Sequence, residues 1–228
     1  MGTFIPRLKE FEKTLLSDFS KEIQKKSNPI IAIGGFSGTG KDTVALIVQK
    51  YFENRHNLSL RLVHAGEFVR KIAVESGWDE KNMDEFMAHV KTTHDDEFAE
   101  KVDLEIEKHA LKTALLEGGI FVGRMAPFAI GTHGTTIWLE VAAHVIAQRI
   151  SNDSSRAEYQ MNQEELIKKI QSRDQTDGDR LEKIYQISFR DKKNFDLTLR
   201  NETYSLEDLE QLIISLLEKK YPSKINEE

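Results

Sequence analysis

The amino-acid sequence predicts an α/β fold in which helices cover both faces of a five-stranded parallel sheet. Short apolar runs alternate with stretches of helical periodicity from Ile30 to Lys219, and this alternation is typical of parallel sheets with right-handed helical crossovers. The second observation is a glycine-rich segment, Gly35–Thr43, between the first apolar run and the next helical stretch. A loop in that position is a frequent phosphate-binding element of α/β proteins.

An amphipathic helix is predicted at Phe4–Lys26, because apolar side chains recur there at spacings of three and four. The segment Ser27-Asn28-Pro29 ends it. Each predicted strand is a short apolar, β-branched run or an alternation of apolar and polar residues. The five strands are expected at Ile30–Ile33, Leu58–His64, Ile120–Val122, Thr135–Val141 and Phe195–Leu199.

Helices are predicted wherever apolar side chains between the strands follow a helical period. Gly77 and the pair Gly118-Gly119 end two of them, and Ser205 caps the last one, with Asp208 at the third helical position. The expected helices are Asp42–Phe52, Gly66–Ser76, Asn82–Lys91, Asp95–Glu117, Ala142–Ile150, Asn162–Tyr185 and Leu206–Lys219.

The composition limits the classes of function. The 228 residues suffice for one substantial core with a small mobile attachment, or for one domain with an appended helix. The absence of cysteine excludes disulfides, thiolate zinc sites and cysteine nucleophiles. A net charge of −6 argues against a general nucleic-acid binder. No basic segment leads into an apolar run at the start, and no stretch approaches the roughly 18 apolar residues of a membrane span. We therefore expect a cytoplasmic protein without membrane or nucleic-acid partners, monomeric or, as the alternative, dimeric.

The glycine-rich segment has the spacing of a P-loop, whose backbone N–H groups surround phosphate while its lysine supplies a mobile positive charge. That loop type has Ser or Thr directly after the lysine, but here Asp42 follows Lys41 and the hydroxyl comes one residue later, at Thr43. Asp42 suits the first turn of a helix but would repel phosphate. We expect its carboxylate to point away from the phosphates or toward a metal, and Thr43 to lie near phosphate or a metal-bound water. A turn without a ligand is the alternative. The residues assigned to phosphate binding are Gly35, Ser37, Gly38, Thr39, Gly40, Lys41, Asp42 and Thr43.

Several arginines stand at element ends, where the pockets of parallel sheets lie. Arg124 is the strongest candidate, because a Gly-Arg pair directly after a strand is poor material for packing. Asp177 and Arg180 lie three positions apart and so share a helix face; they form either a surface ion pair or a pair that reads a ligand. Each arginine could also be an ordinary solvated residue. The other candidates are Arg70, Arg149 and Arg173, and a weaker metal hypothesis concerns His89, His94, Asp95 and Asp96, which otherwise form a polar helix junction.

Five segments resemble, in order and spacing, the cytidylate kinases, most closely the archaeal-type branch of the P-loop nucleoside monophosphate kinases. They are GGFSGTGKDT, HAGEFVRKIAVESG, GGIFVGRMAP, IWLEVAAHVIAQRI and KIQSRDQTDGDRLEKIYQISFRDKKNFDLTL, within Ile30–Ile214. The resemblance implies a three-layer α/β/α kinase domain at 29–220, with a helical monophosphate-binding region at about 65–117 and a mobile helical lid at about 151–186. Residues 1–28 would be an extra helix outside this pattern, and 221–228 a frayed tail.

The resemblance also implies an activity, the transfer of the γ-phosphoryl group of ATP to CMP or dCMP with Mg²⁺. By it, Arg70 and Arg124 would bind the monophosphate, while Arg149 and Arg173 would act with Lys41 on the transferring group. Asp177 and Arg180 would contact the cytidine side, and Asp103 would reach the nucleoside. Two residues depart from the family pattern: Val122 stands where many relatives have an acidic residue, and Asp42 replaces a small one. A P-loop kinase for another small molecule and a silent ATP-binding regulator are the alternatives.

Overall fold

The central sheet has five parallel strands in the order β2-β3-β1-β4-β5. The computed structural model describes residues 4–26, 28–79, 82, 85–86, 89–90, 96–152, 154, 158–186 and 191–222. In this order β1 lies between β3 and β4, so the connections leave it toward opposite edges, and a crevice forms at its carboxyl end. The strands are β1 (Ile30–Gly35), β2 (Leu62–His64), β3 (Gly119–Val122), β4 (Thr135–Glu140) and β5 (Leu197–Arg200).

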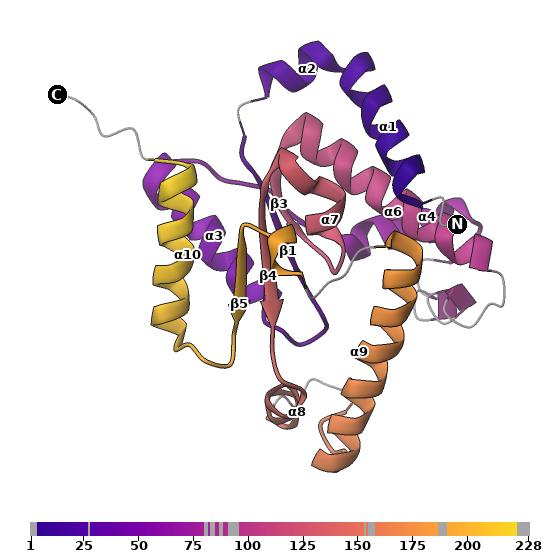
Figure 1. The fold of residues 1–228 in the computed structure, drawn as a ribbon, viewed down its shortest axis with the longest axis vertical. Helices are drawn as coiled ribbons and strands as arrows, with labels where there is room; N and C mark the ends of the chain where they lie inside the picture. Colours follow the sequence, from indigo (N-terminus) through magenta and orange to yellow (C-terminus); the bar gives the residue numbers. More distant parts are fainter. Residues whose placement is uncertain are drawn as a thin grey trace.

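Helices cover both faces of the sheet, which confirms the predicted three-layer α/β/α architecture. Helices α3 (Lys41–His56) and α10 (Leu206–Lys220) lie on one side of the sheet, and α6 (Asp96–Glu117) and α7 (Ala126–Ile130) on the other (Figure 1). The strand side chains alternate between these two layers, since successive residues of a strand point to opposite faces. Ile31 and Ile33 therefore belong to the core with α3 and α10, while Ile30 and Ala32 belong to the core with α6.

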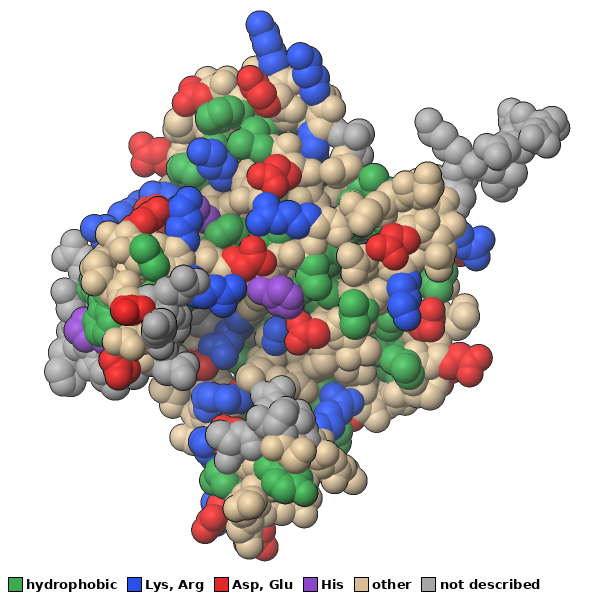
Figure 2. Space-filling model, turned by 180° about the vertical axis from the view of Figure 1, so that it is seen from behind, with side chains coloured by type: hydrophobic (Ala, Val, Ile, Leu, Met, Phe, Trp, Pro, Cys, Tyr) green, Lys and Arg blue, Asp and Glu red, His purple; other side chains and the backbone are tan. Residues whose placement is uncertain are grey.

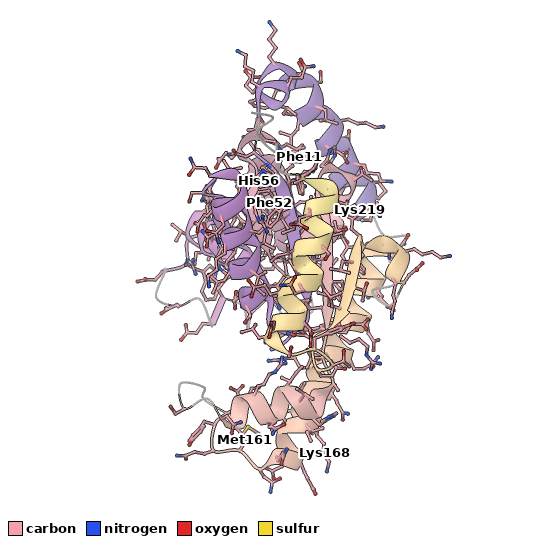
Figure 3. All side chains as sticks on the ribbon, turned by 90° about the vertical axis from the view of Figure 1, so that its left-hand side faces the viewer. Phe11, Phe52, His56, Met161, Lys168 and Lys219 are labelled. Atoms are coloured by element: carbon pink, nitrogen blue, oxygen red, sulfur yellow. The ribbon has the colours of Figure 1, made fainter. Side chains whose placement is uncertain are left out.

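Helix α4 (Ala65–Glu75) directly follows β2 and packs on α6, and together they form the start of the predicted monophosphate-binding region. The predicted helix Asn82–Lys91 falls largely outside the described residues. Helices α8 (Ala143–Ser151) and α9 (Gln163–Tyr185) share a small core of their own, made by Ile146, Ala147, Ile150, Leu166 and Ile170. Figure 3 shows this arm, with Met161 and Lys168 labelled, extending away from the sheet.

The predicted N-terminal helix is two helices, α1 (Phe4–Asp18) and α2 (Ser20–Lys25), because Phe19 has a non-helical backbone with φ −116° and ψ 25°. Leu8 and Leu15 of α1 are buried in a cluster with apolar side chains of α6. Glu12 also pairs with His133, at 2.6 Å, in the short 3₁₀ turn Gly131–His133. Helix α1 contacts α9 as well as α6, so this N-terminal pair is packed onto the sheet domain.

Two of the strands begin later than the sequence predicts. The predicted strand Leu58–His64 pairs only from Leu62, which lies beside Ile120 of β3; Leu60 is buried in the α3 layer, and this burial explains its place in the alternating pattern. The last strand begins at Leu197 and not at Phe195, which follows a 3₁₀ turn at Lys192–Asn194. The Phe195 ring stacks on Trp138 at a centroid distance of 5.0 Å. No helix within the described ranges is long and apolar enough to span a membrane.

Candidate active site

The glycine-rich loop runs from the end of β1 to the first turn of α3, as its sequence predicts. Its backbone has positive φ at Gly35, Gly38 and Gly40, a conformation that side-chain-bearing residues rarely adopt. Gly38 also lies so close to α8 that an added Cβ would be 2.6 Å from Ile146. The loop is therefore curled at the amino end of a 16-residue helix, where N–H groups and the helix dipole favour an anion.

Lys41 is folded over this loop. Its ammonium donates hydrogen bonds to the carbonyl oxygens of Gly35, at 2.9 Å, and Phe36, at 2.7 Å. Burial, and after it the nearby Arg124 guanidinium, lower the pKa of Lys41 to about 8, while Asp42 and Asp174 act in the opposite direction. The Lys41 ammonium thus lies at the loop, where two backbone carbonyl oxygens accept hydrogen bonds from it.

Arg124 lies two residues beyond β3 and is held by α9. Its Nη1 donates to Oδ2 of Asp177 at 2.6 Å, and its guanidinium lies 5.5 Å from the centre of the Phe36 ring. Only 9% of the Asp177 side chain is exposed, so this ion pair is largely removed from water. Asp177 therefore does not form a surface pair; the side chain of Arg180, its predicted neighbour on the helix face, lies outside the described residues.

Asp174, one turn before Asp177, belongs to the same charged group, and the sequence reasoning missed it. Burial raises the pKa of its carboxyl, against the opposing effects of Arg173, Arg124 and Lys41. Its Oδ1 is buried and has no hydrogen-bond partner, and the same holds for Nε of Arg173. The only sequence signal was its spacing of three from Asp177, which places both carboxylates on one helix face.

A cavity of about 460 Å³ lies beside the loop, on the side of α8 and α10. Arg149 of α8 lines it, and its Nη2 donates to the backbone oxygen of Asn201 at 3.2 Å. Thr43 is exposed and faces this cavity. Asn201 was also missed by the sequence reasoning. Apolar side chains complete the lining, namely those of Ile146, Ile150, Leu206 and Leu209, together with Tyr204.

The carboxylate of Asp42 is directed to the end of β2, which β3 separates from β1 in the sheet. Its Oδ1 is 3.7 Å from Nδ1 of His64, the last residue of β2, and 80% of the Asp42 side chain is exposed. Basic side chains gather around a hollow near the middle of the face seen in Figure 2. Asp42 itself points toward His64 and solvent, and its role at the phosphates or at a metal stays a prediction.

Two predicted acceptor-side residues are not joined to the loop cavity. Arg70 is exposed on α4, where it lines a separate hollow of about 410 Å³ with other α4 residues. Asp103 is partly buried on α6. Among the described residues there is no cluster of three or more His, Asp and Glu suited to a metal, and the hypothesis on His89, His94, Asp95 and Asp96 falls partly outside them.

The chain matches a sequence model of the cytidylate kinase-like family over residues 30–203. It is 28% identical to the cytidylate kinase of Methanocaldococcus jannaschii over 83% of this chain and 97% of that protein. The same identity relates it to the cytidylate kinase of Methanopyrus kandleri, over 85% of this chain and 97% of the relative.

Two solved structures share the fold of the chain. They are an uncharacterised protein from Eubacterium ventriosum, at 15% identity and a TM-score of 0.57, and the shikimate kinase of Bacteroides thetaiotaomicron, at 18% identity and a TM-score of 0.52. The alignments cover 84% of this chain in both cases, and 99% and 98% of the two structures. At such identities the likeness concerns the fold alone.

Proposed function

The chain belongs to the cytidylate kinase-like family, and on that premise we propose that it phosphorylates CMP or dCMP with ATP. Members of this family are phosphotransferases whose acceptor is itself a phosphate group, and this chain is one of them. Its acceptors are nucleoside monophosphates, and the choice of cytidine is the part that we propose. The observation that carries the proposal is that two cations lie at Phe36 of the loop. Lys41 donates to the Phe36 carbonyl oxygen at 2.7 Å, and the Arg124 guanidinium is 5.5 Å from the centre of the Phe36 ring. Two phosphates bound to these cations would lie close together.

The donor site in this proposal is the loop with the cavity of about 460 Å³. The loop residues from Gly35 to Thr43 would bind the ATP phosphates through backbone N–H groups, and Lys41 would leave the two carbonyl oxygens for the β- and γ-phosphates. The apolar wall around Tyr204 and Leu206 suits the adenine base. Arg149, at the junction of cavity and arm, would then act on the transferring group.

The acceptor would bind on the other side of the loop. Arg124 would bind the phosphate of the acceptor after its ion pair with Asp177 opens. The guanidinium would keep an anionic partner throughout, because the phosphate replaces the carboxylate. Arg173 would join from α9. Asp177, Arg180 and Asp103 are proposed to contact the nucleoside, and Arg70 to reach the phosphate when the region of 65–117 and the lid of 151–186 close over the substrates.

The chemistry that these residues support is positioning and charge neutralisation. The attacking oxygen of a monophosphate is already ionised near neutral pH, so a general base is not required. The lysine and the arginines would instead hold donor and acceptor in line and stabilise the charge on the moving phosphoryl group. Closure of the arm would exclude water, which otherwise competes as the acceptor.

The oxygen donors around the loop fit a magnesium ion shared with the nucleotide. Mg²⁺ is usually held by substrate phosphates, waters and one or two carboxylates, and not by a protein cage. Thr43 and Asp42 offer a hydroxyl and an exposed carboxylate at the cavity of about 460 Å³. Asp174, whose buried Oδ1 has no hydrogen-bond partner, lines a different hollow with Phe36. When bound, the ion would neutralise charge on the β- and γ-phosphates.

An assay that couples ADP formation to a visible readout, run with CMP, dCMP, UMP, AMP and shikimate, tests the proposal. We expect turnover with CMP or dCMP to exceed that with every other acceptor, and Arg124→Gln to reduce kcat/KM by a factor on the order of 10³. Turnover of shikimate or AMP without any pyrimidine activity would reassign the acceptor. Binding of ATP with no turnover of any acceptor would instead identify a silent regulator.

A further inference from the structure

Asn201 links the carboxyl end of β5 to the phosphate-binding loop, 162 positions away in sequence. Its Nδ2 donates to the carbonyl oxygen of Thr39 at 2.7 Å, and both residues are buried. Its backbone N–H donates to Glu140 at the end of β4, at 2.9 Å, so its own position is fixed by the sheet. Its backbone oxygen accepts from Arg149. One residue thus connects the loop, the sheet and α8.

The hydrogen bond from Asn201 determines the orientation of the peptide between Thr39 and Gly40. A peptide group is planar and trans, so its C=O and N–H point in opposite directions. Because the Thr39 carbonyl points to Asn201, the Gly40 N–H points away from Asn201. A phosphate bound by the N–H groups of the loop would lie on that side of the peptide. If this peptide turned over, a carbonyl oxygen would face the phosphates in place of an N–H group.

The side chain at 201 must therefore be a donor of a particular size. An added Cβ on Gly40 would lie 2.5 Å from Nδ2 of Asn201, so the close approach of this side chain to the loop requires glycine at position 40. An aspartate of the same shape would present an acceptor to the acceptor oxygen of Thr39. Leucine has nearly the same shape but leaves the buried carbonyl without its donor.

We propose that Asn201 is a positioning residue for ATP binding, because it holds the Thr39–Gly40 peptide with the Gly40 N–H toward the phosphates. The inference rests on the proposed function only in taking ATP as the ligand of the loop, and it needs no particular acceptor. Asn201 itself touches the loop backbone and acts through it.

The test compares binding of ATP and of adenosine, by calorimetry and without acceptor, for wild type, Asn201→Leu and Asn201→Asp. We expect both variants to bind ATP about 10- to 100-fold more weakly, which is the cost of losing one hydrogen bond to a charged group, and to bind adenosine as wild type does. In steady state, KM for ATP should rise while KM for the monophosphate stays unchanged. If the leucine variant does not fold, Asn201→Ala takes its place, because it adds no charge to the cavity and leaves the Thr39 carbonyl oxygen without the donor at 2.7 Å.

The matched control is Asp196→Asn, at the opposite end of the same strand. Asp196 accepts from the backbone N–H of Thr136 at 2.8 Å and pairs with Lys220 at 2.6 Å, so its loss should lower the Tm without touching the loop. Equal weakening of ATP and adenosine by Asn201→Leu, or the same loss of ATP affinity in the control at a similar Tm, would reduce Asn201 to a structural residue. Unchanged ATP affinity would also overturn the proposal. A wild-type chain that binds ATP but phosphorylates no monophosphate contradicts the proposed function alone.

Discussion

Raising the pH through about 8 should weaken ATP binding, because it removes the charge from Lys41. Burial and the Arg124 guanidinium lower the pKa of Lys41 to about 8 from its ordinary value of 10.5. Below about pH 8 the side chain is a cation that attracts phosphate, and above it the amine is neutral. Bound ATP favours the charged form, so the titration affects the free protein and not the complex.

The size of the effect follows from this pKa. If only the charged form binds, the apparent Kd scales with the factor 1 + 10^(pH − 8), taking the pKa of about 8. Between about pH 7.5 and about pH 9 this factor rises ~8-fold. The second ionisation of a phosphate group lies near ~6 and is complete in this range. Calorimetric titration of ATP at constant Mg²⁺, without acceptor, measures the change directly.

Two variants identify the titrating group. Lys41→Arg should remove the pH step, since a guanidinium stays charged in this range. Arg124→Gln should move the step to higher pH, because Arg124 is one of the charges that lower the pKa of Lys41. Equal affinity of the wild type at both pH values, or the same loss in Lys41→Arg, would refute the assignment. The same titration should raise the stability of the ligand-free fold. Between about pH 8 and about pH 10.5 the unfolded chain binds more protons at Lys41 than the folded chain does, so the free energy of unfolding increases with pH across that window.

Three further variants test other parts of the molecule. Asp174→Asn should raise the Tm of the ligand-free protein, because burial raises the pKa of this carboxyl and its ionised form therefore opposes folding at neutral pH. The same substitution should lower kcat. A fall in both Tm and kcat would contradict this account. Leu15→Ala should lower the free energy of unfolding by about 2–5 kcal/mol, as for other buried leucines, with kcat/KM unchanged, and chemical denaturation measures it. Asp42→Gly should raise the Mg²⁺ concentration needed for half-maximal activity; tighter ATP binding with an unchanged Mg²⁺ requirement would mean that the carboxylate only repels phosphate.

The fold could be predicted because its signals are local. The loop is a run of consecutive residues, and β1 on one side and α3 on the other are recognisable from their own composition and period. The boundaries that failed depend on partners elsewhere in the chain. Leu60 reads as part of a strand, but it is buried under α3 before the chain reaches the sheet at Leu62. Burial and strand pairing give the same alternation, so the sequence alone does not separate them.

The sequence identifies individual residues of the site, but it does not show which of them are in contact. Arg124 was identified because a Gly-Arg pair follows a strand, whereas its partner could not be chosen among the acidic residues of α9. Helical spacing places Asp174 and Asp177 on one face of α9. Which of the two forms the ion pair with Arg124 depends on how α9 packs in the folded chain, and the partner is Asp177. The bond from Asn201 to Thr39 joins the two ends of the domain, and no local pattern reports such a pair.

The acidic residue after Lys41 is compatible with a phosphate site for reasons that lie outside the loop. At the first turn of α3 a carboxylate is favoured by the helix dipole, so repulsion of phosphate is the only cost. That cost falls as the charge moves toward solvent, and the Asp42 side chain is 80% exposed beside His64. Asp177 has the opposite environment: it is buried and neutralises Arg124 in the absence of a phosphate. The two carboxylates therefore differ in burial: Asp42 is screened by water, and Asp177 pairs with an arginine that could instead bind a substrate anion. Neither carboxylate prevents the loop from binding ATP.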